Sequence, residues 1–269
     1  MRSFLTRLLV AAIAIPALLF VFYQGGEWLR VLVAVLIILG MIEAHRLSAK
    51  AGAVFPLSPG VLAALLVPWL SAGLWQGLSW PAWIGVTLVI SAIPVVRGQD
   101  IRALAVGVAA QMVMVLWIGL GLGALVATRS YPDTHGFWWL LLLFANLWVG
   151  DTAAYLFGVW LGKTKLSPIV SPKKTVAGAI AQVIASAAVG IVFVSTGWIA
   201  APAALIISAS LVIGVVGQLG DLFESVLKRT AGEKDSSALI PGHGGVLDRF
   251  DSTLFAAPSL YALLQLWPR

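Results

Sequence analysis

Long apolar runs, separated by short polar segments, repeat along almost the whole chain. Runs of about 20 apolar residues are long enough to cross a bilayer as helices. The pattern predicts nine transmembrane helices, at residues 8–23, 28–44, 58–75, 80–96, 104–127, 137–161, 176–197, 199–220 and 252–267. The first run continues past Pro16 to Tyr23 without a small-residue cleavage pattern, so we expect a true span and no signal peptide. The predicted fold class is all-α, that of a polytopic integral membrane protein.

The composition agrees with this prediction. Charged residues make up 10% of the chain and hydrophobic residues 60%, whereas a soluble domain carries about 25% charged residues. The chain has no cysteine, which excludes disulfides and thiolate metal sites. We expect one integrated membrane domain, in which residues 1–136 form a scaffold of transmembrane helices and residues 137–269 form the catalytic region.

Lysine and arginine gather on one side of the predicted membrane. If the N-terminus is cytoplasmic, 14 of the 17 basic residues lie in inner loops, and three (Arg30, Arg129 and Arg269) lie outside. The positive-inside rule therefore predicts a cytoplasmic N-terminus, with loops 162–175 and 228–251 also facing the cytoplasm. The net charge of +6 follows from this rule and from attraction to anionic lipids, so we do not expect a nucleic-acid partner.

The N-terminal half offers little chemistry. Its ionisable residues lie at span ends or in loops, and Glu43 and His45 lie at the inner end of the second predicted span. We interpret these two residues as interfacial anchors whose polar ends reach the headgroup region.

The sixth predicted span contains a carboxylate, Asp151, ten residues before its inner end at residue 161. Tyr155 lies one turn further along the same helical face. A carboxylate at that depth in a membrane is costly, so it indicates a functional site. A structural hydrogen bond between helices remains the alternative.

The loop 162–175 contains four lysines and precedes the seventh predicted span. We expect Ser171 to cap that helix, with Pro172 in its first turn. Lys173 and Lys174 would then oppose the helix dipole, and a bound polyphosphate would explain their position. The positive-inside rule alone is the alternative explanation.

The segment 221–251 is the most polar part of the chain and holds six of its eleven acidic residues. Four polar residues at its start recur at helical spacing and share one helical face: Asp221, Glu224, Ser225 and Lys228. Further along, residues 241–245 are Pro-Gly-His-Gly-Gly, whose glycines permit positive φ and close approach to a ligand. Asp248 and Asp251 then open the ninth predicted span, where ordinary helix capping is the alternative to metal binding.

These residue types suit metal-assisted phosphoryl or nucleotidyl transfer at the inner leaflet. Oxygen ligands without thiolates favour magnesium over zinc. An ionised phosphate can itself be the nucleophile, and lysine, arginine and the metal neutralise the developing charge. The chain has no G-x-x-x-x-G-K-[ST] sequence, which disfavours a P-loop ATPase.

The segment 225–251 resembles the signature of the phosphatidate cytidylyltransferases, S-x-L-K-R-x4-K-D-x-S-x2-I-P-x-H-G-G-V-x-D-R-F-D, at every fixed position. Residues 151–155, 165–168 and 171–175 are similar to further elements of that family, so the resemblance covers roughly residues 146–255. One departure is Ala177, where many members carry an acidic or amide residue.

The resemblance implies the conversion of CTP and phosphatidic acid to CDP-diacylglycerol and pyrophosphate with Mg²⁺, through attack of the lipid phosphate on the α-phosphorus. A second metal or a monovalent cation stays open. It also implies an all-helical, multispanning and often dimeric protein of the inner membrane, with membrane lipids around it and its active site facing the cytoplasm.

The resemblance further implies residue roles. The metal ligands would be Asp221, Asp248 and Asp251. The catalytic residues would be Asp221, Lys228, Arg229, His243 and Asp248, with proton transfer by His243 left open. The substrate-binding residues would be Asp151, Tyr155, Ser171, Lys173, Lys174, Thr175, Ser225, Lys234, Asp235, Gly244, Gly245 and Arg249.

Two other functions remain open. A CTP-dependent kinase of a lipid or polyisoprenol could use the same metal and lysine set, and would release CDP. An ion-coupled transporter could use Asp151 and Asp221 as coupling carboxylates, but it would leave the glycine-rich loop unexplained.

Overall fold

The structure is a computed structural model that describes residues 2–55, 57–74, 85, 87–89, 100–131 and 136–268, without the side chains of residues 2–7, 59 and 67–74. The predicted span 80–96 lies almost entirely outside the described residues, as does Arg269.

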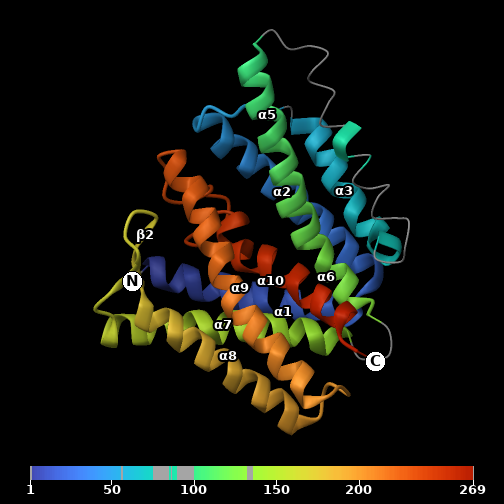
Figure 1. The fold of residues 1–269 in the computed structure, drawn as a ribbon, viewed down its shortest axis with the longest axis vertical. Helices are drawn as coiled ribbons and strands as arrows, with labels where there is room; N and C mark the ends of the chain where they lie inside the picture. Colours follow the sequence, from blue (N-terminus) through green and yellow to red (C-terminus); the bar gives the residue numbers. More distant parts are fainter. Residues whose placement is uncertain are drawn as a thin grey trace. The chain divides into compact units, whose positions relative to one another are not determined.

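The described chain is helical apart from one short hairpin (Figure 1). Its elements are α1 (Arg2–Gln24), α2 (Gly26–Lys50), α3 (Leu57–Leu74), α5 (Ile101–Met114), the π-helical segment η2 (Val115–Leu120), α6 (Gly121–Arg129), α7 (Gly136–Leu161), β1 (Lys165–Ser167), β2 (Ser171–Thr175), α8 (Val176–Thr196), α9 (Ala203–Thr230) and α10 (Leu247–Leu266). Five helices among the described residues are long and apolar enough to cross a membrane: Gly26–Lys50, Ile101–Arg129, Gly136–Leu161, Val176–Thr196 and Ala203–Thr230. The chain is therefore an all-α, polytopic membrane protein, as predicted, whereas nine spans and a cytoplasmic N-terminus stay predictions.

The chain forms two compact units, of which the first contains residues 1–127 and 227–250. Here α2 packs against α3 and η2. Ile37 and Met41 of α2 are fully buried, as is Ile118 of η2. Burial of these apolar side chains fixes the face that α2 presents to its neighbours. The same rotation of the helix determines the direction in which Glu43 points.

The second unit contains residues 128–226 and 251–269. Helices α7 and α8 run side by side along much of their length (Figure 1). Small residues let α9 approach α8 closely, because Gly190 lies against Ser210 and Gly214 against Ser186. This is the way in which membrane helices commonly pack, since lipid offers no hydrophobic driving force between them.

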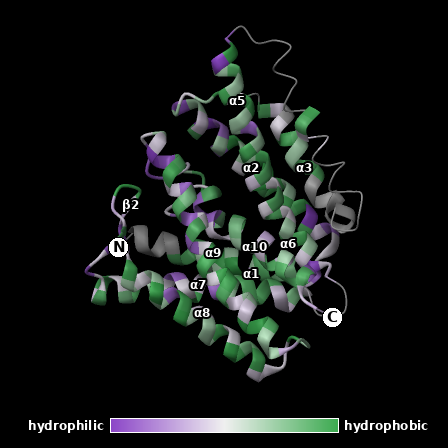
Figure 2. Ribbon diagram, viewed as in Figure 1, coloured by the Kyte–Doolittle hydropathy of each residue, from purple (hydrophilic) through white to green (hydrophobic). Residues whose placement is uncertain are grey.

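Helix α9 extends ten residues beyond the predicted end of its span at residue 220. Asp221, Ser225 and Lys228 therefore belong to one continuous helix, and their spacing puts them on one of its faces. Figure 2 shows hydrophilic residues gathered at this end of α9 and in the loop that follows, while α7 and α8 are mainly apolar. The helix thus leads from the apolar part of the chain into its polar segment.

The lysine loop differs from the predicted helix cap. Ser171 lies in β2, which pairs antiparallel with β1 through Ser167 opposite Ser171 and Lys165 opposite Thr175. Helix α8 begins after Thr175, whose hydroxyl accepts a hydrogen bond from the Gly178 N–H at 3.2 Å. The prediction that Ser171 caps this helix was wrong, because the extended backbone of residues 171–175 makes Thr175 the first residue able to reach the free N–H groups.

Candidate active site

A buried ion pair stands at the centre of the polar loop in the first unit. The Lys228 ammonium lies 2.7 Å from Asp248 Oδ1, and the exposed fractions of the two side chains are 11% and 5%. The other oxygen, Asp248 Oδ2, accepts hydrogen bonds from the Ser236 N–H, the Ser236 hydroxyl and the Gly245 N–H, each at 2.8 Å. Both oxygens of this carboxylate are therefore held in place by donors.

These donors also decide the charge of Asp248, which precedes the predicted span 252–267. Burial alone would raise the pKa of this carboxyl group, but hydrogen bonds from Lys228, Gly245 and Ser236 and the positive charge of Lys228 outweigh burial. The pKa of Asp248 therefore lies below its ordinary value, and the side chain is an anion at neutral pH.

The glycine-rich run of the loop forms a tight turn. The Ile240 N–H donates to the Gly244 carbonyl at 2.8 Å, and the His243 N–H donates to the Ile240 carbonyl at 2.9 Å. Gly242 and Gly244 have φ values of 76° and 82°, which confirms the expectation of positive φ in this run. The turn presents His243 at its tip.

Five predicted substrate-binding or catalytic residues line one cavity of about 560 Å³ in this loop: Lys234, Asp235, His243, Gly244 and Arg249. Arg229 lies outside this group, and its guanidinium donates to the Glu233 carbonyl at 2.9 Å. Four ionisable residues of the segment 228–251 therefore share one cavity: Lys234, Asp235, His243 and Arg249.

Glu43 of α2 is a buried residue that sequence reasoning missed. Its side chain is 3% exposed, and it accepts hydrogen bonds from Ser236, Ser237, Val246 and Leu247. The interpretation of Glu43 as an interfacial anchor was wrong, because partners 193 to 204 residues away in the chain hold the carboxylate in a buried position. The one sequence signal was an acidic residue within an apolar helix.

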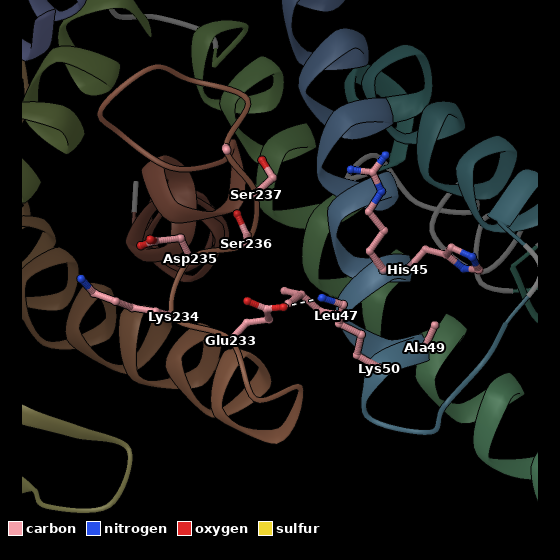
Figure 3. A pocket seen from close by; sticks show the side chains of 11 residues that line it. His45, Leu47, Ala49, Lys50, Glu233, Lys234, Asp235, Ser236 and Ser237 are labelled. Atoms are coloured by element: carbon pink, nitrogen blue, oxygen red, sulfur yellow. Dashed lines mark hydrogen bonds and ion pairs between the residues drawn. The ribbon is translucent and has the colours of Figure 1, made fainter.

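The end of α2 and the segment 233–238 also enclose a second cavity, of about 640 Å³. In Figure 3, Lys50 of α2 and Glu233 point toward each other across it, and these two side chains form an ion pair. The His45 ring contacts Phe55 edge to face, with the ring centres 5.1 Å apart. Two carboxylates, Glu43 and Glu233, thus connect α2 with the polar loop.

The second unit contains a cavity of about 730 Å³ that gathers six further predicted site residues: Asp151, Tyr155, Lys173, Lys174, Thr175 and Asp221. Its lining includes Asp151, Tyr155, Lys165, Lys173, Lys174, Thr175, Gln182 and Asp221, but not Ser171. The Lys174 ammonium lies 2.6 Å from Asp221 Oδ2, and both side chains are partly exposed. The cavity therefore combines carboxylates with the lysines of the hairpin, as a site for a charged phosphate group requires.

Asp151 and Asp221 belong to a larger group of acidic residues in this unit. Gln182 donates to Asp151 at 3.4 Å, and the Ser225 hydroxyl lies at the same distance from Asp221. Asp251 lies within electrostatic range of Asp221, Glu224 and Asp151. No group of three or more acidic or histidine side chains in the described ranges has the compact arrangement of a metal centre. The donor chemistry still fits a hard divalent cation, because all these ligands are oxygens.

The chain matches the model of the cytidylyltransferase family over residues 5–267. It is 34% identical to the phosphatidate cytidylyltransferases of Staphylococcus haemolyticus, over 264 residues, and Staphylococcus saprophyticus, over 263 residues. It is 33% identical to that of Staphylococcus aureus over 269 residues. Each alignment covers 96% of this chain and 98% of the relative.

The chain belongs to the cytidylyltransferase family. The match confirms the family suggested by the signature at residues 225–251. The chain is therefore an enzyme of the nucleotidyl-transfer class. In this cytidylyltransferase the signature residues form the turn, the ion pair and the cavity of the first unit. The cavity of the second unit is lined in part by Asp151, Ala154 and Tyr155 and by Lys173, Lys174 and Thr175.

Proposed function

We propose that this cytidylyltransferase transfers CMP from CTP to phosphatidic acid, giving CDP-diacylglycerol and pyrophosphate for phospholipid synthesis. A phosphate oxygen of the lipid attacks the α-phosphorus of CTP. The bond from that phosphorus to the bridging oxygen breaks, and pyrophosphate leaves with the bonding electrons. The observation that carries the proposal is the alignment of 96% of the chain with enzymes named phosphatidate cytidylyltransferase.

The cavity of the second unit supports binding of an anionic headgroup. Lys173 and Lys174 would bind phosphate oxygens, and Asp151 and Tyr155 would line the space for the lipid headgroup. Lys174 is held against Asp221 in the structure, so binding of a phosphate would exchange one anionic partner for another.

The loop of the first unit supports stabilisation of the transferring phosphoryl group. Lys228, Arg229 and Arg249 would neutralise charge that develops on phosphate oxygens. Lys234, Asp235, His243 and Gly244, which line the cavity, would contact the nucleotide, and Gly245 would shape the loop beside them. Ser225 would add a hydroxyl donor from α9. The fixed backbone of the loop limits reorganisation during the reaction.

The acidic residues support a requirement for Mg²⁺. Asp221, Asp248 and Asp251 would hold the ion, which supplies Lewis-acid neutralisation of the phosphate oxygens when bound. Asp248 supplies a negative charge for this role, and the Lys228 ammonium, which lies 2.7 Å from Oδ1, would have to give up that oxygen to the ion. The distribution of basic residues further supports an inner-membrane location with both loops facing the cytoplasm.

The test is pyrophosphate release by the purified protein in detergent micelles with phosphatidic acid, CTP and Mg²⁺, with and without EDTA. We expect metal-dependent pyrophosphate and an equal amount of CDP-lipid. Release of CDP with a phosphorylated lipid alcohol would favour a kinase instead. Absence of CTP turnover by folded protein would refute the proposal and return transport to consideration.

A further inference from the structure

Both carboxylate oxygens of Glu43 accept hydrogen bonds from the segment 236–247. Oε1 accepts from the Ser237 hydroxyl at 2.7 Å and the Val246 N–H at 3.0 Å. Oε2 accepts from the Ser236 hydroxyl at 2.9 Å and the Leu247 N–H at 2.9 Å. Each oxygen therefore accepts from one backbone N–H and lies beside one hydroxyl, and the single proton of the Ser236 hydroxyl is shared between Glu43 Oε2 and Asp248 Oδ2.

This symmetry makes the carboxylate hard to replace. A glutamine side chain would substitute an NH₂ group for one oxygen, and at either position that NH₂ group would face a backbone N–H donor. The donor left without an acceptor would be buried, because Glu43 is 3% exposed. An aspartate would keep both acceptor oxygens but would be shorter by one methylene group.

The surrounding backbone is fitted to the same carboxylate. A Cβ atom at Gly245 would overlap the Ser236 hydroxyl and would lie 2.5 Å from each oxygen of Glu43. The glycine at this position therefore allows the chain to pass directly over Glu43. This explains one fixed glycine of the loop by packing, whereas Gly242 and Gly244 are explained by their positive φ.

Ser236 links Glu43 to the buried ion pair. Its hydroxyl lies 2.9 Å from Glu43 Oε2 and 2.8 Å from Asp248 Oδ2. Its backbone N–H also donates to Asp248. Any displacement of Ser236 therefore moves a donor of Asp248, and Asp248 in turn holds Lys228.

We infer that Glu43 is a positioning residue for nucleotidyl transfer, which holds the segment 236–247 against α2 and thereby fixes Asp248 and Lys228. Glu43 contacts the loop and acts through it. The inference rests on the proposed function, because turnover of CTP and phosphatidic acid is the activity that it concerns. Its geometry lies entirely within the first unit.

The experiment compares Glu43→Gln and Glu43→Asp with wild type and with Glu27→Gln. Glu27 makes the matched control, since it is an exposed glutamate of the same helix. Turnover is measured per folded enzyme in the monodisperse detergent fraction, so that a loss of folded protein does not count as a loss of activity. Amide hydrogen exchange at Val246 and Leu247 is measured in parallel.

We expect Glu43→Gln to lower kcat between about tenfold and 100-fold with little change in KM for the lipid, because misplaced reacting groups slow the chemical step. Exchange at Val246 and Leu247 should accelerate. Glu43→Asp should retain more activity than Glu43→Gln, and Glu27→Gln should match wild type. A kcat for Glu43→Gln within about twofold of wild type would overturn the inference.

Two further measurements keep the inference testable. If Glu43→Gln does not fold, Ser237→Ala removes one donor to Glu43, and wild-type kcat in both Ser237→Ala and Glu43→Asp would overturn the inference. If wild type itself does not turn over CTP, the proposed function fails separately. The positioning of the segment 236–247 by Glu43 is then judged by hydrogen exchange alone, and unchanged exchange at Val246 and Leu247 in Glu43→Asp would refute it.

Discussion

Replacing Asp248 with asparagine tests the loop at its most constrained position. Oδ1 faces the Lys228 ammonium, and Oδ2 faces two backbone N–H groups and a hydroxyl. An asparagine NH₂ group would therefore meet a donor on either side. The substitution also removes the negative charge beside a lysine whose side chain is only 11% exposed.

The magnitude follows from the burial of this pair. Removing one member of a buried ion pair costs about 3–5 kcal/mol, because the other charge stays in the interior. For a chain of this size each kcal/mol shifts the thermal midpoint by about 2–4 °C, so we expect a fall of roughly 10 °C for Asp248→Asn. Turnover of CTP should fall about 100-fold or more if this carboxylate acts in the transition state.

The assay is a thermal unfolding curve in detergent beside the pyrophosphate assay. Asp100→Asn is the matched control, because Asp100 caps α5 through the Arg102 N–H at 2.9 Å and asparagine caps equally well. The double variant Lys228→Met/Asp248→Asn should regain part of the thermal midpoint but no turnover. An unchanged midpoint and near-normal turnover in Asp248→Asn would refute both the buried pair and the metal assignment.

Three further outcomes follow from the structure. Gly245→Ala should destabilise the protein by about 1–3 kcal/mol through overpacking. Gly40→Ala should be tolerated, because its Cβ would lie 3.4 Å from the nearest side chains. Thermal unfolding of the two variants tests this difference. Lys174→Met should lower turnover at least about tenfold through loss of a charged hydrogen bond. Lys163→Met, at an exposed lysine of the same loop, should leave turnover unchanged. Equal effects of the two substitutions would refute phosphate binding by Lys174. Because the pKa of Asp248 is lowered in the folded state, the stability that its carboxylate contributes to folding is fully present above the ordinary pKa of 3.8 and is lost as the pH falls below that value. Acidification from about pH 5 to pH 3 should therefore destabilise wild type more than Asp248→Asn.

Sequence patterns predicted the helical architecture well. The runs at 28–44, 104–127, 137–161, 176–197 and 199–220 each correspond to a long apolar helix. Length and hydropathy are sufficient here, because a chain in lipid must satisfy its backbone hydrogen bonds within helices. The ends of elements were less predictable, and α9 continues to Thr230 because helix formation does not stop where the apolar residues do.

The cavity of the second unit was predictable in its residues but not in its geometry. Spacing put Asp151 and Tyr155 on one helical face, and the structure places both in the lining of one cavity with Lys173 and Lys174. The β1–β2 hairpin that carries the lysines escaped prediction, since β2 is five residues long and contains Pro172. Short strands depend on a pairing partner, and local patterns do not reveal that partner.

Glu43 illustrates why long-range contacts escape such patterns, because the need for one follows from where α10 begins and from burial. A side chain that caps a helix accepts hydrogen bonds from the N–H groups two and three residues after it. A cap at Val246, the residue before α10, would therefore leave the N–H groups of Val246 and Leu247 without an acceptor. Those groups are buried, and a buried N–H without an acceptor costs about 1–3 kcal/mol. Glu43 provides that acceptor, and a carboxylate is favoured beside the positive end of a helix dipole. Only the packing of α2 against its neighbours determines that this carboxylate is Glu43.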